Sequence, residues 1–97
     1  RWLAFEGSLD ALQHDRMADA LDESIAKMDS GETLVIDLRA VDFIDSRAVG
    51  GLVRALKLVS AKGGRMFLHG AGASVSEIIS LLRLDKLLPE WKGGTPA

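Results

Sequence analysis

The run Thr33–Leu38 constrains the fold more than any other part of this 97-residue chain. Its sequence, Thr-Leu-Val-Ile-Asp-Leu, is almost continuously aliphatic and β-branched, without the alternation of a strand that has one solvated face. Such a run is typical of a central strand covered on both faces, as in parallel sheets. The rest of the chain must therefore supply helices that cover the sheet and connect its parallel strands.

Two amphipathic stripes flank this run and predict such helices. The first has apolar residues at i, i+4, i+8 and i+11, namely Met17, Leu21, Ile25 and Met28. The second has them at i, i+3, i+4, i+7 and i+10, namely Val49, Leu52, Val53, Leu56 and Val59. Each spacing places the apolar side chains on one face of a helix. We therefore predict one helix before the central strand and one after it.

Shorter runs predict two more strands and a last helix. Trp2–Glu6 and Arg65–His69 are typical of short strands, and Gly63–Gly64 ends the helix that precedes the second of them. The last helix has an apolar face made of Val75, Ile78, Ile79 and Leu82. We expect three leucines to close the core after it: Leu84, Leu87 and Leu88.

Cap residues predict where the helices begin. Asp10 with Gln13 forms a capping-box pattern for the first helix, and Ser74 with Glu77 forms one for the last helix. Ser46 is placed to cap the middle helix, because its hydroxyl can accept a hydrogen bond from a free backbone N–H group.

Strands therefore alternate with helices along the chain, and residues 39–45 are expected to form a loop. This order predicts a single α/β domain over residues 1–91, with a mixed or parallel central sheet covered by amphipathic helices. Residues 92–97 contain two glycines and a proline and are expected to form a flexible tail.

The charges of the chain are unevenly distributed. Residues 1–45 hold 11 acidic and 4 basic side chains, whereas residues 46–97 hold 3 acidic and 8 basic ones. The bases lie beside an acidic half and aromatic residues make up only 5% of the chain, which argues against nucleic-acid binding. The chain has no cysteine and no uncharged apolar run of about 18 residues, and we expect no signal peptide. We therefore expect a cytoplasmic protein that does not insert into a membrane.

The chemistry-bearing residues do not match a catalytic, cofactor or metal site. Gly70 and Gly72 begin a dinucleotide fingerprint, but Val75 stands where its third glycine belongs. His14 and His69 lie far apart in the sequence and have no further ligand at metal spacing. The sequence therefore predicts a non-enzymatic protein without a cofactor or a bound metal ion.

Three aspartates gather around the end of the central strand, where open α/β sheets often place function: Asp37, Asp42 and Asp45. A phosphoaspartate or magnesium site of the receiver type would also need an acidic pair on the first strand and a lysine after the Met-Phe-Leu strand. The chain has neither. We therefore interpret the three aspartates as solvated loop carboxylates.

Two glycines inside the middle helix need an explanation. Gly50 and Gly51 each cost about 1 kcal/mol of helix stability relative to alanine. They either allow close packing of the helix on the sheet or leave a bare surface for a partner. The sequence leaves both explanations open.

The order of these motifs resembles that of a STAS domain, the fold shared by anti-sigma factor antagonists and the regulatory tails of sulfate transporters. The resemblance spans Trp2 to Pro89. It rests on Gly7–Asp10, Val35–Leu38, Phe43–Ser46 with Gly50, Gly63–Met66, and Leu84 with Leu87 and Leu88. Members of the family usually carry one more strand before the position of Trp2.

The resemblance implies a role for Ser46. In the phosphorylated members of the family, the serine or threonine after the loop aspartate accepts phosphate from a serine kinase that doubles as an anti-sigma factor. Ser46 follows Asp45 in this way and is the expected phosphoacceptor. The family pattern continues with Ser or Thr and then Gly, whereas this chain has Arg47 and Ala48. Arg47 is suited to hold a phosphate or to contact an acidic partner.

We expect the partner to dock on the exposed side of the helix that follows Ser46. Four residues there recur at i, i+4, i+7 and i+11 on one stripe: Arg47, Gly51, Arg54 and Leu58. The full set of expected contact residues is Asp45, Arg47, Gly50, Gly51, Arg54 and Leu58.

Two roles follow from the resemblance. The leading hypothesis is an anti-sigma factor antagonist that binds a serine-kinase/anti-sigma factor and is controlled by phosphorylation of Ser46. The alternative is a regulatory domain or subunit of a membrane transporter, either a sulfate-type anion carrier or an ABC lipid-trafficking system. In the alternative, Ser46 is a contact residue and not a switch.

Overall fold

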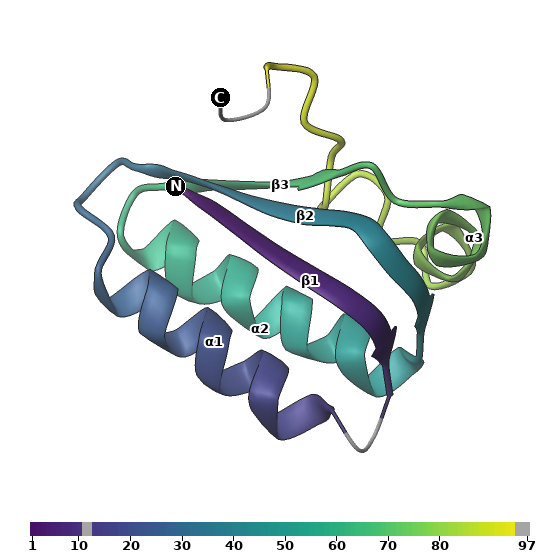
Figure 1. Ribbon diagram of the computed structural model, residues 1–97. Helices are drawn as coiled ribbons and strands as arrows, with labels where there is room; N and C mark the ends of the chain where they lie inside the picture. The colour runs from purple at the N-terminus through teal and green to yellow at the C-terminus, as the bar shows by residue number, and fades with distance from the viewer. Residues whose placement is uncertain (11–12, 95–97) are drawn as a thin grey trace.

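The structure is a computed structural model that describes residues 1–10 and 13–94. Within these residues strands and helices alternate: β1 (Trp2–Leu9), α1 (His14–Ala26), β2 (Thr33–Ile44), α2 (Ser46–Ala61), β3 (Arg65–His69) and α3 (Ala73–Leu81). The strands form one parallel sheet in the order β1-β2-β3 (Figure 1). The predicted α/β fold is therefore confirmed, and the run from Thr33 lies in its central strand.

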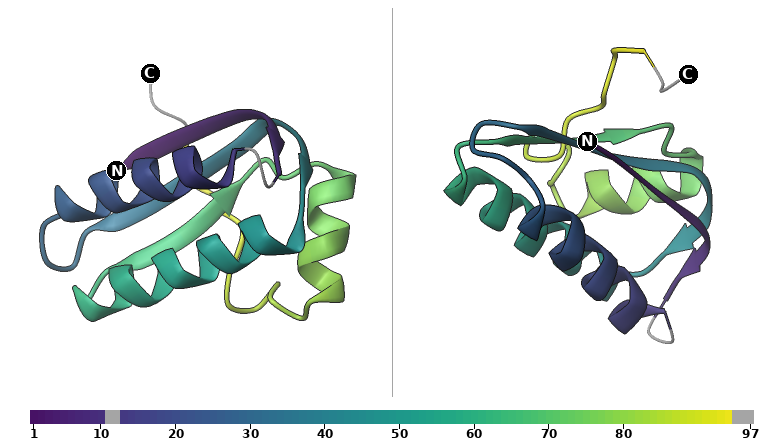
Figure 2. Two further views of the ribbon diagram at one scale, coloured as in Figure 1. Left: turned by 90° about the horizontal axis from the view of Figure 1, so that it is seen from below. Right: turned by 60° about the vertical axis from the view of Figure 1, so that its left-hand side comes forward.

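Helices α1 and α2 lie side by side against one face of the sheet, and α3 packs near one end of it (Figures 1 and 2). The predicted apolar stripe of α1 is confirmed for Met17, Leu21 and Ile25, which are each at most 4% exposed. Met28 is also buried, at 5% exposure, but it lies beyond the end of α1 at Ala26. In the stripe of α2, Val49, Leu52 and Val59 are fully buried, and Val53 and Leu56 pack against the core. These faces meet the inner side chains of the sheet, among them Leu34, Ile36, Leu38, Met66 and Leu68.

The opposite face of the sheet is covered by aromatic side chains and by the segment after α3. The rings of Trp2 and His69 lie 5.2 Å apart, and those of Phe67 and Trp91 lie 5.4 Å apart. The segment runs beside the edge of β3, where Glu90 forms an isolated parallel bridge with Leu68 and the backbone N–H of Trp91 donates to the carbonyl of Leu68. It then continues on the side of the sheet away from α1 and α2 (Figure 1). The central strand is thus buried on both faces, as its sequence predicts.

Strand β2 is longer than its sequence predicts, because residues 39–44 belong to the strand and not to a loop. Ala4 pairs with Asp37 but Glu6 pairs with Ala40, so β2 carries one extra residue there. A second irregularity, at residues 41–43, adds another. These two β-bulges change the spacing of the buried residues from two to three, which hides the strand from a period-two pattern. They also bend β2 towards α2 (Figure 1).

The predicted helix caps are wrong by one or more residues. The N-cap of α1 is Gln13 and not Asp10, and the N-cap of α3 is the extended Gly72 and not Ser74. Asp45, and not Ser46, caps α2, because Asp45 has extended backbone angles and its carboxylate accepts a hydrogen bond from the third helical amide. Each predicted cap lies within three residues of the observed one, but none of the three observed caps was predicted as a cap.

Two leucines that were expected in the core are exposed. Leu82 is 43% exposed and Leu87 is 53% exposed, whereas Leu88 is buried. Helix α3 ends at Leu81, and Arg83 adopts a left-handed backbone with φ of 58°, so the chain turns before the apolar stripe can continue. The domain boundary at residue 91 and the flexible tail stay predictions, and residues 95–97 of that tail lie outside the described residues.

Candidate functional site

Ser46 lies exposed at the corner where β2 ends and α2 begins. The corner is held on both sides, because Ile44 before it and Ala48 after it are at most 2% exposed. Asp45 ties the corner to the neighbouring strand, since its backbone N–H donates to the carbonyl of Leu9 at 3.1 Å. The hydroxyl-bearing residue is therefore presented to solvent on a rigid frame.

The Asp45 carboxylate occupies part of the helix N-terminus beside Ser46. Its Oδ1 accepts the N–H of Ala48 at 2.8 Å, and its carbonyl accepts the N–H of Val49 at 3.1 Å. Among the described residues, the N–H groups of Ser46 and Arg47 have no acceptor. Positive partial charge and two free donors therefore remain next to the serine.

Two basic residues of α2, Arg47 and Arg54, differ in their partners. Arg54 reaches α1, where its Nη1 lies 2.8 Å from Oδ1 of Asp22. Arg47 is exposed and forms no ion pair within the part of the chain that the structure describes. A shallow groove of about 400 Å³ between the helices is lined by Ala18, Asp22, Arg47, Gly50, Gly51 and Arg54. Leu58, the remaining expected contact residue, is 38% exposed farther along α2.

Gly50 distinguishes between the two explanations for the helix glycines. A Cβ atom at Gly50 would meet no other atom within 4 Å, so no close packing requires glycine there. The residue leaves a bare, exposed patch on the first turns of α2. Gly51 is half-buried and lines the groove between the helices. The packing explanation is therefore wrong for Gly50.

The three aspartates do not form a cluster, and Asp37 is not a loop carboxylate. Asp37 is only 6% exposed in β2, and Arg39 binds it through a 2.7 Å contact from Nη2 and further bonds from Nε and the backbone. Trp2 adds a bond from Nε1 at 3.1 Å. The hydrogen bonds from Arg39 lower the pKa of Asp37 to about 2. Asp42 is exposed, as expected, and Asp45 is a helix cap.

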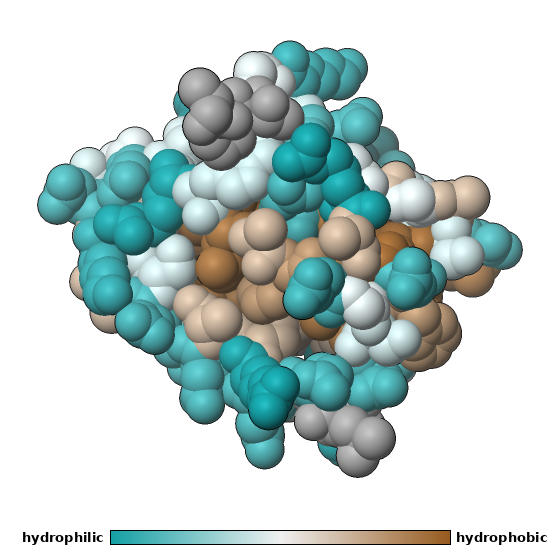
Figure 3. Space-filling model, viewed as in Figure 1, coloured by the Kyte–Doolittle hydropathy of each residue, from teal (hydrophilic) through white to brown (hydrophobic). Residues whose placement is uncertain are grey.

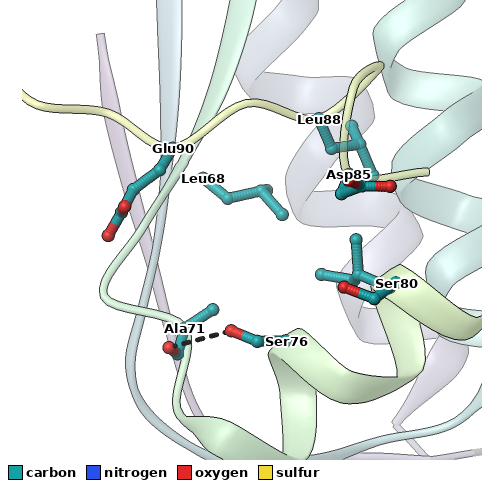
Figure 4. A pocket seen from close by; sticks show the side chains of 8 residues that line it. Leu68, Ala71, Ser76, Ser80, Asp85, Leu88 and Glu90 are labelled. Carbon is teal, nitrogen blue, oxygen red and sulfur yellow. Dashed lines mark hydrogen bonds between the residues drawn. The ribbon is translucent and has the colours of Figure 1, made fainter. Parts of the chain in front are cut away.

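Further hollows lie elsewhere on the described part of the molecule, and two of them have apolar linings. One, of about 240 Å³, lies between β3, α3 and the following segment, with an apolar floor that includes Leu68, Ile79 and Leu88 (Figure 4). The polar side chains at its rim are exposed, so nothing buried within it selects a ligand. The other is an apolar groove between β1 and α1, on the face where Figure 3 shows a central hydrophobic area. Neither hollow includes a residue of the Ser46 corner.

In a comparison with known protein families, the sequence model of the STAS domain matches residues 2–92 of this chain. The chain belongs to the STAS domain family. This STAS domain is 29% identical over 83 residues to an anti-sigma F factor antagonist of Paenibacillus polymyxa, which covers 86% of this chain and 70% of that protein.

Solved structures show the same family fold. A crystal structure of an anti-sigma factor antagonist from Mycobacterium paratuberculosis matches with a TM-score of 0.82 and 25% identity, over 95% of this chain and 76% of that one. A sulfate transporter family protein from Wolinella succinogenes matches with a TM-score of 0.68 and 13% identity, over 91% and 71% of the two chains. The second likeness is one of fold alone. No helix among the described residues is long and apolar enough to span a membrane.

One residue beside the corner, Phe43, was not predicted from the sequence to be exposed. Phe43 is 49% exposed, although it stands in a strand between the buried Val41 and Ile44. No signal in the sequence separates an exposed phenylalanine of a bulged strand from a buried one. Only the register of β2 shows that Phe43 points away from the core.

Proposed function

We propose that this STAS domain is an anti-sigma factor antagonist that binds a serine-kinase/anti-sigma factor and releases it when Ser46 is phosphorylated. The observation that carries the proposal is the exposed serine at the first position of α2, directly after an aspartate that caps the helix. The similarity to the antagonists of Paenibacillus polymyxa and Mycobacterium paratuberculosis supports the same role. The domain acts in the cytoplasm by binding, without chemistry of its own, and the kinase brings the nucleotide and magnesium.

A phosphate on Ser46 would meet opposing electrostatic effects. It adds about −1.5 to −2 charge. The helix N-terminus and the free N–H groups of Ser46 and Arg47 attract it, but the carboxylate of Asp45 already occupies the amide of Ala48 and repels it. The phosphate therefore stays at the surface instead of replacing the cap. The fold of the domain changes little, and the bound partner experiences the new charge.

Charge repulsion alone does not complete the switch. A like-charge pair at about 6 Å and an effective dielectric constant near 20 costs roughly 3 kcal/mol. A change from 99:1 bound to 1:99 requires about 5.5 kcal/mol. The remainder must come from the desolvation and the bulk of a phosphate inside the interface.

The test is incubation with the serine kinase encoded nearest to this gene, with ATP and magnesium, followed by intact-mass measurement. We expect the mass of one phosphate on the wild type and none on Ser46→Ala. Ser60→Ala, which removes another exposed serine of α2, serves as the control and is expected to be phosphorylated like the wild type. Ser46→Asp is expected to weaken binding of the kinase. No added phosphate together with unchanged binding by Ser46→Asp would refute the proposal.

A transporter partner is the second candidate, supported by the fold shared with the sulfate transporter family protein of Wolinella succinogenes. In this role Ser46 is a contact on the same surface of a regulatory domain or subunit. Binding of a transporter subunit that Ser46→Asp weakens, in a protein that the kinase does not modify, would favour this candidate over the first.

A further inference from the structure

Phe43 is exposed because of the second bulge of β2. Gly7 of β1 pairs with Val41, and the next residue, Ser8, pairs with Phe43. Asp42 therefore has no partner on β1, and β2 gains one residue there. Val41 and Ile44 still face the core, at 6% and 2% exposure. Phe43 is turned outwards at 49% exposure, and it is the large apolar residue of the described strands that is most open to solvent. Bulges commonly redirect a side chain next to a functional site.

We propose that Phe43 is the apolar anchor that holds the anti-sigma partner beside Ser46. This inference rests on the proposed function and names the residue through which the domain holds its partner. Three residues of extended chain span at most about 10 Å, so Phe43 and Ser46 fall within one interface of ordinary size. Aromatic side chains are among the residues that carry most of the binding energy of such interfaces.

Phe43 is flanked in the chain by the exposed Asp42 and by Asp45, whose carboxylate caps α2, and the helix that follows carries the bases that define the chemistry of the partner. Helix α2 carries Arg47, Arg54 and Lys57 and no acidic residue. Arg54 is paired with Asp22, whereas Arg47, next to Ser46, forms no ion pair among the described residues. The complementary surface is an apolar pocket that accepts a phenyl ring and has a carboxylate at its rim for Arg47. The bare patch at Gly50 lets the backbone of the partner approach α2 closely.

The anchor also explains how phosphorylation releases the partner. An interface hot spot contributes its energy only when the surrounding contacts exclude water. A phosphate on Ser46, three residues along the chain from Phe43, brings its hydration shell into that surrounding ring of contacts. Phosphorylation then weakens the apolar contact in addition to the repulsion of charges. This second loss supplies what repulsion alone does not.

The experiment measures the affinity of the purified kinase for the unphosphorylated and the phosphorylated domain, by calorimetry. Phe43→Thr removes the ring and introduces a β-branched residue that suits a strand, and Phe43→Leu keeps an apolar side chain. Leu87→Ser is the control, because Leu87 has a similar exposure of 53% on the segment after α3. The urea midpoint of each variant establishes that it is folded.

We expect Phe43→Thr to weaken binding of the unphosphorylated domain by about 30-fold, the loss typical of a hot spot, and to reduce the affinity ratio between the two phosphorylation states. Phe43→Leu is expected to keep most of the affinity and Leu87→Ser all of it. Wild-type affinity in Phe43→Thr, an equal loss in Leu87→Ser, or an unchanged ratio overturns the anchor while the proposed function stands. A wild-type domain that binds no kinase refutes the proposed function and the anchor with it.

Discussion

Replacing Asp37 by asparagine tests whether the ion pair on the outer face of the sheet stabilises the fold. The change keeps the size of the side chain and leaves an oxygen that can accept the bond from Trp2. It removes the charge that Arg39 binds through its guanidinium and backbone. We therefore expect a loss of stability that depends on ionisation.

The magnitude follows from the pKa of Asp37, which Arg39 lowers from 3.8 to about 2. Each pKa unit corresponds to about 1.4 kcal/mol, so the shift amounts to about 2.5 kcal/mol. Solvent around Arg39, whose side chain is 54% exposed, screens the pair and reduces this to about 1.5 to 2 kcal/mol. Because the folded pKa is depressed, this stabilisation is fully present above the unfolded pKa near 4 and is lost as the pH falls towards 2.

Urea unfolding of the wild type and of Asp37→Asn at pH 7 and pH 3 measures the effect. The difference in the free energy of unfolding is expected to be about 1.5 to 2 kcal/mol at pH 7 and about half of that at pH 3. Asp42→Asn, which changes an exposed carboxylate of the same strand, is the control and should shift stability by less than about 0.5 kcal/mol. An equal loss at both pH values would show that packing and not charge is responsible, and would refute the reasoning.

Two further substitutions test the helices. Gly50→Ala adds a methyl group in open space and is expected to raise the free energy of unfolding by about 0.5 to 1 kcal/mol. It is also expected to weaken the binding of the kinase. A lower free energy of unfolding in this variant would contradict the open geometry at Gly50. Lys62→Met removes the bonds from Nζ to the carbonyls of Ile25 and Met28 at the end of α1 and is expected to cost about 1.5 to 3 kcal/mol in urea unfolding. Lys57→Met, at an exposed lysine without such bonds, is the control. An equal loss of stability in Lys57→Met would refute a stabilising role for the bonds of Lys62.

Apolar periodicity predicted the elements that carry a full core face. The stripe of Met17, Leu21 and Ile25 follows from helical geometry, because each of the three is buried against the same sheet. The run from Thr33 to Leu38 indicated a central strand for the same reason, since both of its faces are covered. Where the pattern of burial is complete, the sequence therefore determines the element.

The remaining differences arise where tertiary contacts choose between local alternatives. Asp45 and Ser46 are both competent caps, and the bond from the Asp45 amide to Leu9 on another strand favours the first. Asp37 was interpreted as a solvated loop carboxylate together with Asp42 and Asp45, but it is buried in β2, where Arg39 and Trp2 of β1 satisfy its carboxylate. The position of Ser46 at the start of a helix was predictable, whereas the exposure of Phe43 depends on a bulge that no local pattern encodes.

Because of the bulges, the number of residues in β2 determines the direction in which the side chain of Ser46 points from α2. The stretch Val35–Ile44 pairs with the shorter stretch Trp2–Leu9, so two residues of β2 are taken up by bulges. Deleting one of these two residues would leave the sheet able to form. Each residue of α2 would then occupy the place that the residue before it occupies now. One position turns a helical side chain by about 100°. The hydroxyl would leave the corner and Arg47 would take its place, so this strand tolerates exchange of residues far better than their deletion.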